Sequence, residues 1–147
     1  MEDKWEKVVD MYNKYPNIQY TKLTVSKDTA LHITVLESTK DIVSKRGWET
    51  RSPLWMPNDR GNMPLHVVAL IGNVGKCMCI AEKHEELLGL SNNAVEMPLF
   101  LASLCGKKGS FHYLDRICKP GRHYEYLRGG TNSQTILRVA IIGQYYG

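Results

Sequence analysis

Long apolar runs are missing from this chain of 147 residues. None approaches the roughly 18 consecutive apolar residues that a membrane-spanning helix needs, so we expect that this chain alone does not cross a bilayer. The acidic start, MEDKWEK, also lacks the basic region and the apolar core of a secretory signal peptide. These absences favour an intracellular, cytoplasmic protein.

Recognisable catalytic motifs are absent as well. The sequence contains no glycine-rich phosphate loop, no nucleophile elbow and no arrangement of paired carboxylates. His84-Glu85 resembles the start of a metalloprotease helix, but Leu88 stands where the second histidine ligand belongs. The sequence therefore predicts a protein that is not an enzyme and that takes no small-molecule substrate and no cofactor.

Cysteine is scarce, with one residue at each of positions 77, 79, 105 and 118. Without a secretory signal, these residues are expected to be reduced thiols instead of a disulfide framework. Cys77 and Cys79 lack the usual spacing of zinc ligands, and two residues apart on a helix they point to different faces. No metal site is predicted.

The formal charge is only +4, and it is unevenly distributed. Residues 100–147 contain seven lysines and arginines against two acidic residues, whereas the rest of the chain has a net charge of −1. This basic end is compatible with an acidic partner, a lipid headgroup surface or nucleic acid. The alternative, an ordinary solvated surface, is favoured, and nucleic-acid binding has little support.

The chain does contain an internal repeat with a period of 34 residues. The segments TALH, MPLH, MPLF and TILR begin at Thr29, Met63, Met97 and, after a longer spacer, Thr135. Gly72 and Gly106 follow two of these segments at the same distance. Each copy predicts a turn, a helix, a glycine stop and a second helix, because proline is favoured at the first helical position and glycine just after the last. The second helix of the clearest copy should place Val74, Cys77, Ile80 and Ala81 on one apolar face.

This period and these segments resemble ankyrin repeats. More narrowly, DRGNMPLH, GNVGKCMCIA, MPLFLASLCGKK and TILRVAIIG resemble the plant ankyrin-repeat proteins that carry a C-terminal transmembrane PGG domain, and WEKVVDMYNKYP followed by DTALHITV resembles the start of their array. The resemblance implies an all-α fold, an ankyrin-repeat solenoid of stacked helix-turn-helix units with short β-turn or hairpin fingers. The chain then looks like a fragment of such a protein that lacks the PGG domain.

The expected domain organisation is a single array over 1–147. A half repeat at 1–19, beginning with an amphipathic helix at 5–15, precedes repeats at about 20–57, 58–90 and 91–127, and a partial repeat follows at 128–147. Residues 46–57 match the pattern poorly and are expected to be irregular, with Trp48 and Trp55 either packed in the core or exposed as anchors. Both ends of the chain fall within a repeat.

The resemblance implies a non-catalytic protein–protein interaction module that acts in plant stress and defence signalling. Its partners are other proteins, whose identity the sequence does not give, and membrane attachment would come only from a C-terminal region missing here. One alternative is a truncated scaffold that self-associates through uncapped ends. A second alternative is a weak binder of an acidic partner or nucleic acid.

The candidate partner-binding residues follow from the family arrangement, in which fingers and the two residues before each helix-ending glycine face a concave surface. They are Asn58, Asp59, Arg60, Asn92 and Arg128 in the fingers, and Leu70, Ile71, Leu104 and Cys105 before the glycines, with Ile142 in the last unit. An exposed apolar strip along this surface would mark a contact site. The alternative, that these side chains pack against the next finger, stays open.

Departures from the family pattern predict a soft array. Thr29 and Thr135 keep the capping hydroxyl, whereas Met63 and Met97 replace it, at roughly 1 kcal/mol per lost cap. His32 and His66 occupy the structural histidine position of the repeat. We therefore interpret both as packing residues instead of general bases or ligands.

Overall fold

The computed structural model describes residues 10–11, 14–37, 51–118, 128–129 and 134–135. This part of the chain is helical, and it also contains one ladder of two short strands. In chain order the elements are η1 (Pro16–Tyr20), α2 (Ala30–Glu37), α4 (Arg51–Leu54), α5 (Pro64–Ile71), α6 (Val74–Lys83), η2 (Glu85–Gly89), α7 (Pro98–Leu104), α8 (Lys108–Ile117), β1 (Arg128–Gly129) and β2 (Gln134–Thr135). Within it, no helix has both the length and the apolar content needed to cross a bilayer.

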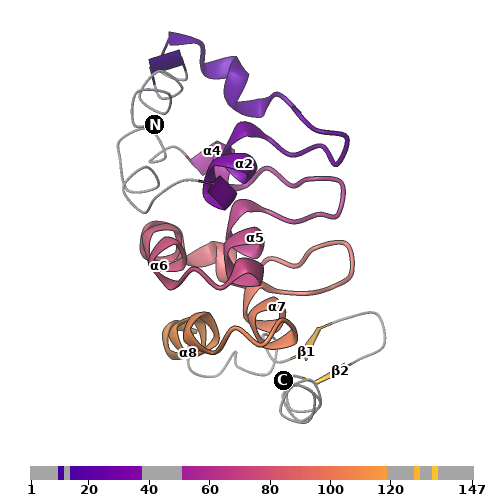
Figure 1. The fold of residues 1–147 in the computed structure, drawn as a ribbon, viewed down its shortest axis with the longest axis vertical. Helices are drawn as coiled ribbons and strands as arrows, with labels where there is room; N and C mark the ends of the chain where they lie inside the picture. The colour runs from indigo at the N-terminus through magenta and orange to yellow at the C-terminus, as the bar shows by residue number, and fades with distance from the viewer. Residues whose placement is uncertain (1–9, 12–13, 38–50, 119–127, 130–133, 136–147) are drawn as a thin grey trace.

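Three short helices form the centre of the structure. Helices α2, α5 and α7 lie one after another along the longest axis, and α2 packs on α5 while α5 packs on α7 (Figure 1). Helices α6 and α8 lie on one side of them and pack on each other, and long loops extend to the opposite side (Figure 1). We call α2, α5 and α7 the column helices and these loops the fingers.

The boundaries of α5 confirm those expected from the sequence. Pro64 is its first residue, and Gly72 follows its last residue with a φ of 80°, in the left-handed region that favours glycine. The Met63 side chain makes no cap hydrogen bond, as predicted. Helix α7 repeats this arrangement between Pro98 and Leu104, with Gly106 at a φ of 65°.

The second helix of each pair is amphipathic. In α6, Cys77, Ile80 and Ala81 are buried and Val74 packs partly against the core, as predicted. The Asn73 side chain caps α6 by accepting a hydrogen bond from the backbone N–H of Lys76 at 3.1 Å. These side chains meet Leu65, Val68, Leu99 and Phe100 of the column helices in one continuous core.

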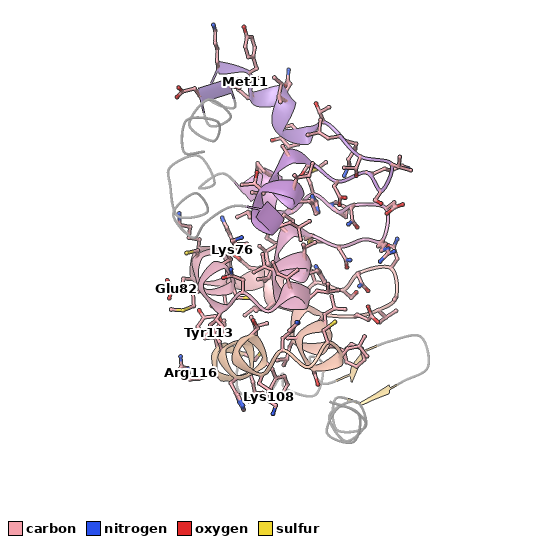
Figure 2. All side chains as sticks on the ribbon, in the orientation of Figure 1. Met11, Lys76, Glu82, Lys108, Tyr113 and Arg116 are labelled. Carbon is pink, nitrogen blue, oxygen red and sulfur yellow. The ribbon has the colours of Figure 1, made fainter. Side chains whose placement is uncertain are left out.

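A buried lysine links two of these helices. Lys76 on α6 is only 2% exposed, and its Nζ donates a hydrogen bond of 2.6 Å to the carbonyl oxygen of Val35 near the end of α2. Carbonyls in the last turn of a helix have no partner within the helix, so this lysine satisfies one of them. Burial lowers the pKa of Lys76 because it disfavours the charged form. Figure 2 shows its place at the end of α6 that faces α2.

The fingers share one hairpin geometry. Lys22 and Thr29 form an antiparallel bridge, and Arg128 pairs with Thr135 in the β1–β2 ladder at the same separation along the chain. The three fully described fingers are 22–29, 56–63 and 90–97. Each turns through one residue with a positive φ, namely Lys27 (60°), Gly61 (75°) and Val95 (59°). These three positions are 34 residues apart.

Val95 is poorly suited to its backbone conformation, because a β-branched side chain clashes with the backbone when φ is positive. Its side chain is also 56% exposed, so little packing compensates. We expect Val95→Gly to raise the free energy of unfolding by about 1 kcal/mol. Val25→Gly is the matched control, since Val25 is fully exposed without a positive φ and should gain nothing. Chemical denaturation of both variants checks this, and equal effects would contradict it.

Some of the expected structure can be compared directly and some cannot. Within the poorly matching stretch, Arg51–Leu54 forms α4, Leu54 is buried and Trp55 packs partly against the core, which confirms packing for Trp55. Trp48, most of the helix expected at 5–15, Ile142 and the helix expected after Thr135 lie outside the described residues. The half repeat at 1–19 and the partial repeat at 128–147 are likewise described only in part.

Candidate protein interface

His32 and His66 have fully used ring nitrogens. His32 Nδ1 accepts hydrogen bonds from the backbone N–H and hydroxyl of Thr29, and its Nε2–H donates to the carbonyl of Asn62 at 2.8 Å. His66 Nδ1 accepts from the backbone N–H of Met63, and its Nε2–H donates to the carbonyl of Leu90 at 3.0 Å. Each ring therefore joins the start of its own helix to the next finger, which confirms that both are satisfied packing histidines.

These rings are held neutral. Burial lowers the pKa of His66 to about 4 and, together with it, that of His32, although the bonded carbonyls oppose the change. Both side chains are completely buried, so a substrate cannot reach them.

Two asparagines predicted to contact a partner build the fingers instead. Asn58 Oδ1 accepts from the backbone N–H of Arg60 and Asn62, and Asn58 Nδ2 donates to Asp28 at 3.0 Å. Asn92 Oδ1 accepts in the same way from Ala94 and Glu96, and Asn92 Nδ2 donates to Asn62 and Glu96. Asn92 is only 8% exposed. Because these amides close each turn and bond the preceding finger, we assign them a structural role.

Removing Asn92 should loosen its finger. We expect Asn92→Ala to cost about 2 kcal/mol of unfolding free energy, because it leaves buried backbone N–H groups without an acceptor. Asn93→Ala is the control, since the exposed Asn93 side chain makes one described hydrogen bond, to the carbonyl of Asp59. That change should cost less than about 1 kcal/mol. Denaturation curves for the two variants decide, and a larger loss for Asn93→Ala would refute the structural role of Asn92.

The remaining predicted finger residues are placed differently. Asp59 and Arg60 are exposed at the tip of the second finger, and the Arg60 guanidinium has no hydrogen bond or ion pair within the described part of the chain. Arg128 lies in β1, where its backbone pairs with Thr135. The structure thus brings Asp59 and Arg60 together on one finger and leaves Arg128 on another.

The predicted helix-end residues lie at the surface. Leu70 is 37% exposed and Leu104 is 46% exposed, Cys105 is exposed, and Ile71 is half-buried. Leu36, 34 residues before Leu70, is 51% exposed at the end of α2. Sequence reasoning missed Leu36 because Ser38, not glycine, follows it, although the spacing alone could have found it. We call Leu36, Leu70 and Leu104 the leucine column.

The leucine column is not a by-product of a loose core. Leu65, Val68 and Ala69 on the same helix α5 are completely buried, and the ends of α5 and α7 carry no charged side chain. One exposed leucine is ordinary on a protein surface, but the same exposed residue on three packed helices makes a linear apolar surface. Surfaces of this kind mark sites of macromolecular contact.

The cysteines and acidic residues do not form another type of site. Burial raises the pKa of the Cys77 and Cys118 thiols to about 11 and also raises that of Cys105, so none is poised to react as a thiolate at neutral pH. Among the residues that the structure describes, no three histidines, cysteines or acidic residues come together in a way that could hold a metal ion.

Comparison with protein-family models and with curated proteins gives no match for this chain. The functional argument therefore depends on the geometry described above.

Proposed function

We propose that this chain is an ankyrin-repeat solenoid that serves as a non-catalytic protein–protein interaction module. Recurring contacts support this fold. The histidine-to-carbonyl bonds of His32 and His66 occur one period apart, and the Asn58 and Asn92 amides make equivalent bonds to the preceding finger. Stacked units joined by the same contacts are the defining property of solenoid proteins.

The observation that carries the functional proposal is the leucine column. Its three members occupy one register position on three successive column helices and stay 37–51% exposed. Keeping three leucines in water gains nothing for folding, so their regular placement is best explained by a partner that covers them. By resemblance, the proposal extends to a cytoplasmic role in plant stress or defence signalling.

Site-specific photo-crosslinking tests this proposal. A photoreactive amino acid at position 70 or 104 should capture the same partner protein from cell extract, because both positions lie in the leucine column. The matched control is position 116, since Arg116 is exposed on the side formed by α6 and α8 (Figure 2). No capture from position 116 is expected. Equal capture from all three positions, or none from any, would argue against the proposed surface.

A further inference from the structure

The leucine column has a defined spacing along its length. Each leucine sits on a different column helix, and these helices pack directly on one another. Axes of packed helices lie about 8–10 Å apart, so successive leucines are separated by about the same distance. A bound segment must present apolar side chains at this interval on one side of its backbone.

Regular backbone conformations differ in whether they meet this requirement. A β-strand places every second residue on one face, at intervals of about 6.6 Å or about 13 Å, which misses the spacing. An α-helix presents every seventh residue at about 10.5 Å, just beyond it. A polyproline II segment presents every third residue at about 9.3 Å, within it. Such a segment is also narrow, which suits a surface one leucine wide.

The fingers add a charge preference. Asp28 accepts hydrogen bonds from Asn58 and Thr24, and Glu96 accepts one from Asn92, so these carboxylates are engaged within the chain. Lys27 and Arg60 are exposed, with no partner for their charged groups in the described part of the structure. On the other side, Lys107 lies against Gly72, directly after Leu70 and Ile71.

The fingers and the leucine column border the same open side. Helices α6 and α8 cover the opposite side of the column helices from the one where the fingers extend (Figure 1). The exposed leucines face away from the buried side chains that meet α6 and α8. The cationic groups of Lys27 and Arg60 are therefore available to a segment that lies on the leucines.

We propose that the leucine column binds an extended, polyproline II-like protein segment that has an apolar residue at every third position and acidic residues between them. This proposal rests on the proposed function, because it names the chemistry of the partner at the same surface. The apolar residues pack on Leu36, Leu70 and Leu104. The acidic residues meet Lys27 and Arg60, whose charges the chain itself leaves unpaired.

A fluorescent peptide with the sequence Leu-Pro-Glu repeated four times is a direct probe, because proline favours the extended conformation. Fluorescence anisotropy with the full chain should show saturable binding that weakens with added salt. A peptide with the four-residue period Leu-Pro-Glu-Pro keeps the composition similar but breaks the register. A peptide with lysine in place of glutamate reverses the charge. Both should bind at least about tenfold more weakly.

Variants of the protein locate the binding. Leu70→Lys should weaken binding of the probe by at least about tenfold, whereas Leu70→Met, which keeps an apolar side chain, should change it by less than about threefold. Arg60→Glu tests the charged edge and should remove most of the salt dependence. As a second readout, bound probe should protect the exposed Cys105 thiol from a maleimide reagent.

The outcomes separate this inference from the proposed function. Tighter binding of a helical peptide with leucine at every seventh position, or equal binding of all peptides, would overturn the inference. A selection from a random peptide library, with Leu70→Lys as the counter-selection, covers that case. Binders that need Leu70 but lack the three-residue period would leave the proposed function standing. If no selected binder needs Leu70, both proposals fail.

Discussion

Acidification from about pH 7.5 to about pH 4.5 is expected to lower the free energy of unfolding by roughly 2–3 kcal/mol through His66 alone. Burial lowers the pKa of His66 to about 4 in the folded chain, from 6.5 in the unfolded chain. Between these values the unfolded chain binds more protons, so acid favours unfolding. The contribution is fully present above pH 6.5 and is lost as the pH falls to about 4. The lowered pKa of His32 acts in the same direction.

The physical cause is the hydrogen bond at Nδ1. That nitrogen accepts from the backbone N–H of Met63, and a protonated ring could no longer accept it. Denaturation at several pH values should therefore show a smaller acid-induced loss for His66→Gln than for the wild-type chain. The exposed His112 gives the control variant, His112→Gln, which should keep the full loss. An unchanged pH dependence in His66→Gln would contradict the assignment.

A second large effect distinguishes two leucines of one helix. Leu65→Ala should cost about 2–5 kcal/mol, because Leu65 is completely buried in the continuous core and its removal leaves a cavity. Leu70→Ala is the same chemical change five residues later and should cost less than about 1 kcal/mol, because Leu70 is 37% exposed. Urea denaturation of both variants provides the measurement. Similar losses would mean that Leu70 belongs to the core.

The sequence predicted the column helices well because their signals are local. Pro64 and Gly72 fix the ends of α5 through backbone geometry alone, and the spacing of Cys77, Ile80 and Ala81 fixes the buried face of α6. The same local signals identified Leu70 and Leu104, because both directly precede the turns that end their helices.

Contacts between distant segments were not predictable in this way. Nothing in the neighbourhood of Lys76 indicates that its amino group reaches the end of α2. Likewise, Asn92 looks like an exposed turn residue, and its burial arises only because Asn62 of the preceding finger lies beside it. The strain at Val95 also became visible only from its positive φ, since valine gives no turn signal.

The most direct test of the leucine column is a triple variant, Leu36→Lys, Leu70→Lys and Leu104→Lys, measured for both stability and partner binding. If the leucine column is a contact surface, its unfolding free energy should stay within about 1 kcal/mol of the wild-type value, while the protein captured by crosslinking from position 71 is lost. A loss of more than about 3 kcal/mol in stability, or retention of the same partner by the folded variant, would contradict the account.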